Sequence, residues 1–187
     1  RECLTSVVRL FDAAAKIKSL KPEISILQEL PEYQIVDALR LRQIVANLIG
    51  NAVKFTDHGS ITFNAEKIIK DGSSEMLIEV SDSGRGVADS DKNSLFDAFT
   101  QADQSIYKPD SGTGLGLAIS KQLIELMQGS IGVRDNDKNG ATFGIRLPIT
   151  ETDQITEGKK ENHSIKSDAR YAGLHIRVAD DNAIKRK

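Results

Sequence analysis

The strongest structural signal in this chain lies in residues 40–56, which read Arg40-Leu41-Arg42-Gln43-Ile44-Val45-Ala46-Asn47-Leu48-Ile49-Gly50-Asn51-Ala52-Val53-Lys54-Phe55-Thr56. At about 100° per residue, Gln43, Asn47, Asn51 and Lys54 share one narrow arc of a helix. The arc facing away from it is apolar and holds Leu41, Ile44, Val45, Leu48, Ala52 and Phe55. The pattern predicts an amphipathic helix, and Asp37 is placed to cap its first turn.

The polar arc of this helix has a specific chemistry. Amide oxygens such as those of Asn47 and Asn51 are suitable ligands for Mg²⁺, and the ammonium of Lys54 is a point charge suited to phosphate. Taken alone, the arc is more simply interpreted as the solvated side of an ordinary helix. Two glycine motifs further along the chain favour the metal- and phosphate-binding interpretation over the solvated helix face.

The first glycine motif is Ile78-Glu79-Val80-Ser81-Asp82-Ser83-Gly84-Arg85-Gly86-Val87. Strand alternation sends Ile78, Val80 and Asp82 to one face, and a carboxylate that continues an apolar row needs a donor. An adenine amino group is one such donor, and Gly84 and Gly86 let the backbone approach a flat ring. The alternative is an ordinary Asp-Ser-Gly turn at the end of a strand.

The second glycine motif is Ser111-Gly112-Thr113-Gly114-Leu115-Gly116-Leu117-Ala118-Ile119-Ser120. A glycine-rich loop here leads into an apolar-periodic helix, whose free N–H groups form an anion site. The alternative is a loop followed by a core helix. The spacing does not match the dinucleotide-binding fingerprint, and the sequence contains no P-loop motif.

These motifs, with Leu95-Phe96-Asp97-Ala98-Phe99 and Gly140-Ala141-Thr142-Phe143, occur in an order that closely resembles the catalytic ATP-binding domain of sensor histidine kinases. That domain shares a superfamily with type II topoisomerases, a heat-shock chaperone and mismatch-repair ATPases. The resemblance covers about residues 1–150. It implies the Bergerat-type ATP-binding fold, with ATP and Mg²⁺ as ligands.

The resemblance also implies a role for each matching residue. Asn51 would be the metal ligand, Asn47 and Lys54 would contact phosphate or the water shell of the metal, and Asp82 would accept from adenine. Gly84 and Gly86 would shape the pocket, and Thr142 would close its adenine side. The phosphates would meet the second glycine motif, at Gly112, Thr113, Gly114, Leu115 and Gly116. Phe96 and Phe99 would anchor a lid over residues 101–111.

Two details bear on the reaction. Hydrolysing members of the superfamily carry a glutamate general base four residues before the metal-binding asparagine, where this chain has Asn47. An amide cannot take a proton from water, which favours a kinase over an ATPase. Within the lid, Lys108 stands where the family usually has arginine, and Ser111 replaces a glycine. We assign Asn47, Lys54 and Lys108 to catalysis, although the lysine lacks arginine's planar fork.

Periodicity and turn residues predict the element order. We expect helices over residues 2–17, the segment after Asp37, 92–98 and 114–128. Strands are expected over 23–29, 60–69, 75–82, 130–135 and 140–148, with residues 71–74 as a hairpin turn. The order suggests an α/β two-layer sandwich, with a mixed β-sheet and helices packed on one face.

Composition favours a globular domain followed by a tail. The 187 residues carry a net charge of −2 and are 39% hydrophobic, which gives no electrostatic argument for nucleic-acid or membrane binding. No apolar run approaches the roughly 18 residues of a membrane span, and the lone Cys3 suits a reducing compartment. The chain begins at Arg1 rather than at a methionine and has no signal peptide, so we expect a cytoplasmic piece of a longer protein. The resemblance implies a parent that is an inner-membrane sensor, and without the family's dimerisation helices the piece is expected to be monomeric.

The C-terminal residues divide differently. Residues 151–171 are polar and charged, which is typical of a linker. Residues 172–187 contain Leu174-His175-Ile176-Arg177-Val178-Ala179-Asp180-Asp181-Asn182, which resembles the truncated first strand and acidic pair of a response-regulator receiver domain. The alternative is a polar tail that contains Asp-Asp-Asn. The resemblance predicts a hybrid kinase.

The three histidines (His58, His163 and His175) lack the context of the family's substrate histidine, which sits in a separate dimerisation helix. We therefore predict a kinase catalytic domain that binds Mg²⁺-ATP and does not autophosphorylate alone. In the homodimeric parent, it would present the γ-phosphate to a histidine, from which the receiver domain would take the phosphoryl group. The alternatives are a degenerate nucleotide-binding regulatory module without phosphotransfer and a topoisomerase- or chaperone-type ATPase.

Overall fold

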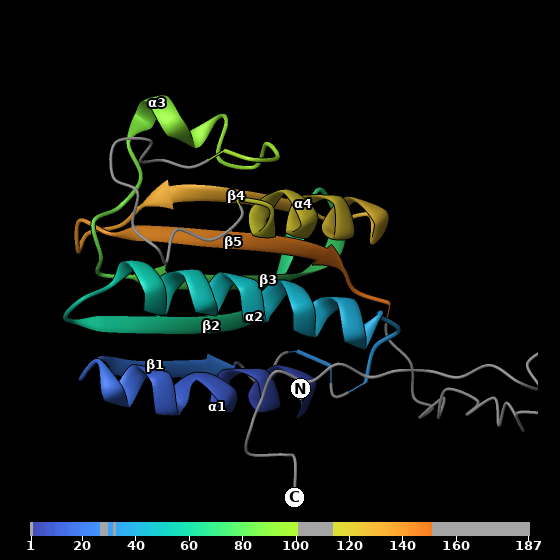
Figure 1. Ribbon diagram of the computed structural model, residues 1–187. Coiled ribbons are helices and arrows are strands. Elements are labelled where there is room, and N and C mark those ends of the chain that lie inside the picture. Colours follow the sequence, from blue (N-terminus) through green and yellow to red (C-terminus); the bar gives the residue numbers. More distant parts are fainter. Residues whose placement is uncertain (1, 27–29, 32, 101–113, 151–187) are drawn as a thin grey trace, which may run out of the picture. The chain divides into compact units, whose positions relative to one another are not determined.

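The computed structural model describes residues 2–26, 30, 31, 33–100 and 114–150. The chain divides into two units, Arg1–Gln154 and Ile155–Lys187, and the described residues all belong to the first (Figure 1). The expected linker at 151–171 and receiver strand at 172–187 lie outside the described residues, so both stay predictions.

A five-stranded mixed sheet forms one layer, with the strand order β1-β2-β3-β5-β4. Its strands are β1 (Lys21–Ile26), β2 (Ser60–Lys70), β3 (Ser73–Asp82), β4 (Ser130–Asp135) and β5 (Ala141–Pro148). β1 pairs in parallel with β2, and the other three neighbouring pairs are antiparallel. The expected mixed sheet is confirmed, although β1 begins two residues earlier than predicted. The β2–β3 turn is also tighter than predicted, because Asp71 and Gly72 both take positive φ and let β3 start at Ser73.

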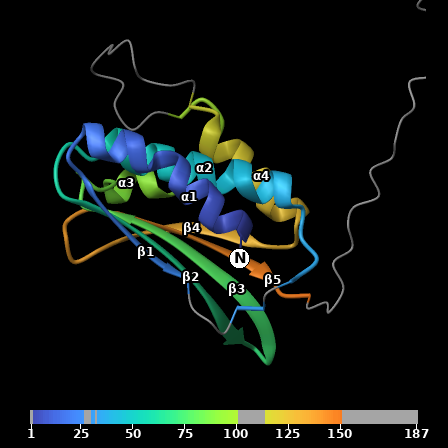
Figure 2. The same ribbon diagram turned by 90° about the horizontal axis from the view of Figure 1, so that it is seen from below.

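Helices α1 (Glu2–Ile17), α2 (Ala38–Phe55) and α4 (Gly116–Leu126) form the second layer, on one face of the sheet (Figure 2). This arrangement confirms the predicted two-layer sandwich. The helix expected at 92–98 is wrong: α3 (Asp89–Lys92) is a single turn, and non-helical turns follow it. Acidic residues at 89 and 91 favour that first turn as the helix start.

α2 is the central helix of this layer, and its apolar arc forms much of the core. Ile44, Val45 and Leu48 are fully buried, as are Ile78 and Val80 on the facing strand β3. Complete burial of one such side chain contributes about 1.5–3 kcal/mol. The helix begins where predicted, because the Asp37 carboxylate accepts from the backbone N–H of Arg40 at 3.0 Å.

Phe55 departs from the predicted apolar arc. It is the last residue of α2 and is 43% exposed, whereas Leu41, Ile44 and Ala52 on the same arc are buried. Helical periodicity assigns Phe55 to the apolar arc of α2, but it does not show how far along the helix that arc is covered by other elements. None of the described helices combines the length and the apolar character needed to cross a membrane.

Candidate functional site

Asp82 is a buried carboxylate at the C-terminal end of β3. Only 6% of the residue is exposed, and it continues the buried row of Ile78 and Val80, as predicted. Its Oδ1 accepts from the backbone N–H of Gly84 at 2.9 Å and from that of Ala141 at 3.5 Å. Burial raises the pKa of Asp82, and these two hydrogen bonds oppose the increase. Both bonds reach Oδ1, so Oδ2 is the oxygen through which the carboxylate would bind a ligand.

Glycine backbone surrounds this carboxylate. A Cβ on Gly84 would collide with the carbonyl oxygen of Phe55, and one on Gly140 would collide with the carbonyl oxygen of Asp82. Gly86 has a φ of +69° and lies against the Asn139 carbonyl. Four segments thus meet at Asp82: the end of α2, the end of β3, the Gly84–Gly86 turn and the β4–β5 loop. These glycines let the backbone segments approach one another more closely than side chains would allow.

Asn47 lies between α2 and the start of α4. Its Nδ2 donates to Ser120 Oγ at 3.0 Å, and Ser120 is only 2% exposed. A Cβ on Gly116 would collide with Asn47 Oδ1, so the glycine at the first position of α4 leaves room for this amide. The N-cap residue of α4 is Leu115, whose side chain has no acceptor for the first N–H groups of the helix. These N–H groups and the Asn47 amide therefore form one polar surface.

Two cations, one at the end of α2 and one in the turn after β3, lie near the ring of the exposed Phe55. The Lys54 ammonium lies 5.1 Å from the centroid of the Phe55 ring, and the Arg85 guanidinium lies 5.2 Å from the same centroid. Asn51, one turn earlier on α2, is half-buried. Asn47, Asn51 and Lys54 thus lie on one helix, at the spacing that the sequence indicated.

Lys18 holds the C-terminal end of α2, a role that the sequence did not indicate. Its Nζ donates to the carbonyls of Val53 at 2.9 Å, Lys54 at 3.2 Å and Thr56 at 3.3 Å. It also lies 3.9 Å from Asp57 Oδ1. A cation at this position satisfies carbonyls that the end of α2 leaves unpaired. A lysine just beyond a helix gives no sequence signal for a partner 35 residues away.

The structure places Thr142 differently from the expectation that it would close the adenine side. Thr142 pairs in register with Ser81, and its hydroxyl lies 2.7 Å from Ser81 Oγ. Since neighbouring strand residues point to opposite faces, Thr142 lies on the sheet face away from the Asp82 side chain. The adjacent Ala141 reaches Asp82 instead, through its backbone N–H.

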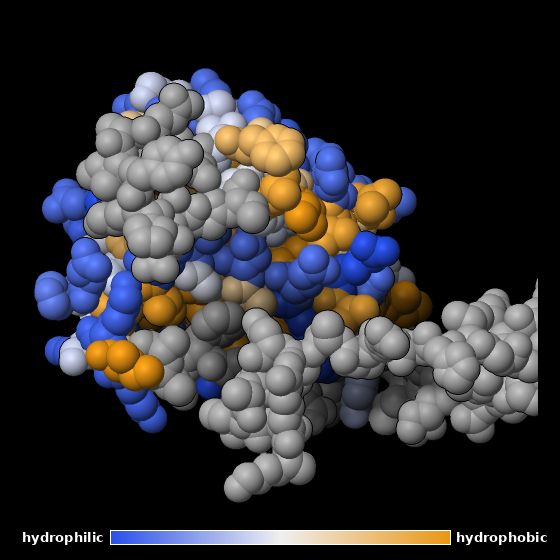
Figure 3. All heavy atoms as spheres, viewed as in Figure 1, coloured by the Kyte–Doolittle hydropathy of each residue, from blue (hydrophilic) through white to orange (hydrophobic). Residues whose placement is uncertain are grey.

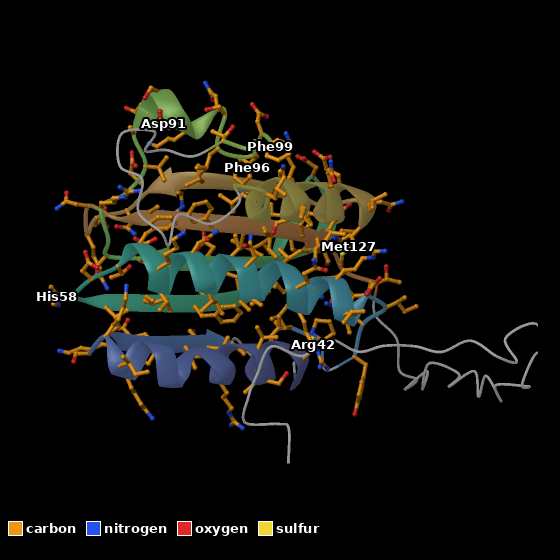
Figure 4. All side chains as sticks on the ribbon, in the orientation of Figure 1. Arg42, His58, Asp91, Phe96, Phe99 and Met127 are labelled. Atoms are coloured by element: carbon orange, nitrogen blue, oxygen red, sulfur yellow. The ribbon has the colours of Figure 1, made fainter. Side chains whose placement is uncertain are left out.

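The two phenylalanines of the segment after α3 behave differently (Figure 4). Phe96 is partly buried and packs against the core, as an anchor should. Phe99 is 76% exposed among the described residues, and its backbone φ is +65°. Its expected role as an anchor of the lid stays a prediction, because the lid lies outside the described residues. Figure 3 shows apolar surface over α4 on this side of the molecule, and Ile119 and Leu126 of α4 are exposed as well.

Several predicted site residues lie outside the described residues: Lys108, Gly112 and Thr113, together with the expected lid over 101–111. Among the residues that the structure does describe, no cluster of three or more His, Cys, Asp or Glu is placed to hold a metal ion. Of the predicted set, only Asn51 was assigned to the metal. An amide oxygen is a weak single ligand, so a metal at this site would need the phosphate oxygens of a ligand as further ligands.

Comparison with known families agrees with this geometry. The model of the family described as histidine kinase-, DNA gyrase B- and HSP90-like ATPases matches residues 36–151. This range contains α2, the buried carboxylate and both glycine motifs. The chain belongs to this family, and its similarity to the sensor kinases described next identifies it as a catalytic ATP-binding domain of the histidine kinase type.

Individual relatives are signalling kinases. The chain is 38% identical over 150 residues to the signal transduction histidine-protein kinase BarA of Escherichia coli strain K12, covering 80% of this chain and 16% of BarA. It is 36% identical over 190 residues to the sensor protein GacS of Pseudomonas syringae pv. syringae, covering all of this chain and 20% of GacS. The chain therefore spans a fifth or less of these relatives.

Solved structures show the same fold. Full-length ShkA in complex with AMPPNP superposes with a TM-score of 0.70 and 34% identity, covering 81% of this chain and 30% of that one. The catalytic domain of the histidine kinase ThkA superposes with a TM-score of 0.68 and 24% identity, covering 80% of this chain and 94% of that one.

Proposed function

We propose that this chain binds Mg²⁺-ATP at the site around Asp82 and α2, and presents the γ-phosphate to a histidine on another domain. The observation that carries the proposal is the Asp82 carboxylate. It is 6% exposed, and its Oδ1 is held by the backbone N–H groups of Gly84 and Ala141. A carboxylate fixed in this way, among glycine backbones, suits a planar ligand that donates a hydrogen bond.

The base would bind on the Asp82 side of the site. Asp82 Oδ2 accepts from the 6-amino group of adenine, and Gly84 and Gly86 keep the approach free of side chains. Phe55 is 43% exposed, and its carbonyl lies against Gly84. It therefore offers an apolar surface beside the base. Thr142 supports β5 from the far face of the sheet rather than contacting the base.

The phosphates would bind on the α2–α4 side. Asn51 would provide a protein oxygen to Mg²⁺, which would neutralise phosphate charge when bound. Asn47, held by Ser120, orients a phosphate or a water of the metal shell, and Lys54 contributes a point charge. The second glycine motif supplies backbone N–H groups through Gly112, Thr113, Gly114, Leu115 and Gly116, and Lys108 supplies a further positive charge.

The acceptor would be a histidine rather than water. The Asn47 amide cannot act as a general base, so the site holds ATP and leaves the nucleophile to a dimerisation domain of the parent protein. A receiver domain of the same hybrid kinase then takes the phosphoryl group. We place this chain on the cytoplasmic side of a homodimeric membrane sensor. The similarity to the sensor kinases BarA and GacS supports this context.

Calorimetric titration of the 187-residue chain with AMPPNP, with and without Mg²⁺, tests the binding step. We expect metal-dependent binding that Asn51→Ala weakens. Addition of γ-labelled ATP together with a separately supplied histidine-bearing dimerisation domain tests the transfer step, and label should appear only on the added domain. Label on the chain alone, or steady phosphate release, contradicts the proposal. Binding without any transfer would indicate a regulatory nucleotide-binding module.

A further inference from the structure

The β4–β5 loop carries an asparagine whose side-chain amide uses its full hydrogen-bonding capacity. Asn136 Nδ2 donates to the carbonyl of Asp82 at 2.8 Å and to that of Ala141 at 3.2 Å. Its Oδ1 accepts from the backbone N–H groups of Lys138 and Gly140, each at 3.0 Å. An amide has two N–H donors and one oxygen with two lone pairs, so Asn136 joins its own loop to the end of β3.

Other contacts fix the same loop at both flanks. On one side, the Lys92 ammonium lies 2.6 Å from Asp135 Oδ2 and 2.6 Å from Asp89 Oδ1, which ties α3 to the end of β4. On the other side, Lys138 Nζ donates to Ser60 Oγ at 3.0 Å. The loop is therefore bound to α3, to the start of β2 and to the end of β3.

The backbone at the end of this loop lies against Oδ1 of the Asp82 carboxylate. Ala141, immediately after the loop, donates its N–H to Asp82 Oδ1 at 3.5 Å. At Gly140 a Cβ would lie 2.9 Å from Oδ1, so the loop backbone is against the carboxylate. The flanking contacts would remain without Asn136, but the loop would lose its side-chain hydrogen bonds to the end of β3. The Ala141 N–H would then be held less firmly against Oδ1.

We infer that Asn136 is a positioning residue for base selection, which holds the Asp82 carboxylate so that it accepts a 6-amino group and rejects a 6-oxo group. The inference rests on the proposed function of Asp82. Adenine presents a donor at position 6 and guanine an acceptor, so a fixed carboxylate attracts the first and repels the second. A carboxylate that can turn reaches the N1 and N2 donors of guanine instead, and the preference falls.

Asn136→Asp is the sharpest test because it keeps the shape of the side chain. It replaces the donating Nδ2 with an oxygen that faces the two carbonyls of Asp82 and Ala141. The matched control is Asn139→Asp, which adds the same charge to the same loop on an exposed residue. Its backbone φ of +61° is one that aspartate tolerates. Asn136→Ala removes the bonds without adding charge, and it answers the question if the aspartate variant does not fold.

Dissociation constants for the imido analogues of ATP and GTP, each with Mg²⁺, are measured on the 187-residue variants, with thermal melting as the check on folding. We expect the wild type and Asn139→Asp to prefer the ATP analogue. We expect Asn136→Asp and Asn136→Ala to lower the ratio of the two affinities by about tenfold.

The outcomes separate this inference from the proposal on which it rests. A folded Asn136 variant that keeps the wild-type ratio overturns the inference, even when both affinities fall together, because a purely structural role would weaken both equally. An equal loss of preference in Asn139→Asp also overturns it, since charge alone would then be the cause. A wild-type chain that binds neither analogue overturns the proposed function, and the inference with it.

Discussion

The two sides of the candidate site are built in different ways. On the base side, Asp82 is 6% exposed and its Oδ1 is held by two backbone N–H groups. On the phosphate side, Asn51 is half-buried and Lys54 is exposed, with its ammonium near the Phe55 ring. A planar base needs one fixed hydrogen-bond geometry, whereas phosphates and a hydrated metal accept charge from several directions. The chain thus buries the carboxylate proposed to bind the base, whereas Asn51 and Lys54 on the phosphate side keep exposed surface and only Asn47 is held by a buried partner.

The comparison predicts that the largest single loss comes from Asp82→Asn. This change can place an amide N–H₂ where the base also presents a donor, and it removes the charge from the hydrogen bond. We expect the affinity for AMPPNP to fall by about 100-fold, equivalent to roughly 2.7 kcal/mol, as measured by calorimetry. The matched control is Asp137→Asn, an exposed loop aspartate, which should bind like the wild type. An equal effect of both substitutions would mean that net charge, rather than the fixed carboxylate, governs binding.

On the phosphate side, Gly116→Ala should have a smaller effect, because Asn51, Lys54 and backbone N–H groups share the proposed phosphate contacts with Asn47. Its methyl group displaces Asn47 Oδ1 and disturbs the bond from Asn47 to Ser120. We expect AMPPNP affinity to fall by about tenfold in Mg²⁺, with less change in adenosine affinity. Gly132→Ala is the control, since a Cβ at Gly132 meets no atom within 4 Å. A loss of adenosine binding as large as that of AMPPNP would contradict the separation of the two sides.

Lys18→Met tests whether the end of α2, which contributes residues to both sides of the site, is stabilised by the Lys18 ammonium. The ammonium donates to three carbonyls at the end of α2, and this end carries Lys54 and Phe55. We expect the free energy of unfolding to fall by about 1–2 kcal/mol, with AMPPNP affinity reduced only severalfold. Denaturant unfolding and calorimetry measure the two effects. Lys16→Met, an exposed change on α1, should leave both unchanged. An unchanged stability in Lys18→Met would show that water replaces the ammonium at these carbonyls.

The smallest expected effect is a pH dependence of stability from Asp82. Burial raises its pKa above the ordinary value of 3.8. Because the folded state holds the proton more tightly than the unfolded state, the stabilising contribution is present below the unfolded pKa. It is lost as the pH rises through the folded pKa. The Tm of Asp82→Asn relative to the wild type should therefore increase between about pH 3.5 and pH 7. A constant difference over that range would contradict the raised pKa.

The sequence predicted most of the fold because its strongest signals are local. The period of α2, the Asp37 cap, the alternation of β3 into Asp82 and the β2–β3 hairpin all follow from neighbouring residues. The helix expected at 92–98 is not present. The structure forms only one turn, Asp89–Lys92, and the Lys92 ammonium bridges the carboxylates of Asp89 and Asp135. That bridge joins residues 43 positions apart, and no local pattern reports it.

The candidate site shows the same difference between local sequence signals and long-range contacts. From the sequence alone came the residue types and their order: the amides and ammonium of α2, the carboxylate ending β3 and the glycines beside it. Only the tertiary structure showed which atoms position these groups. Lys18 donates to carbonyls at the end of α2, and Ser120 accepts from the Asn47 amide. Asn136 donates to the Asp82 carbonyl, and strand register places Thr142 on the opposite face of the sheet. Side-chain chemistry and periodicity are properties of short segments, whereas these contacts join residues brought together only when the helices pack on the sheet and the strands pair.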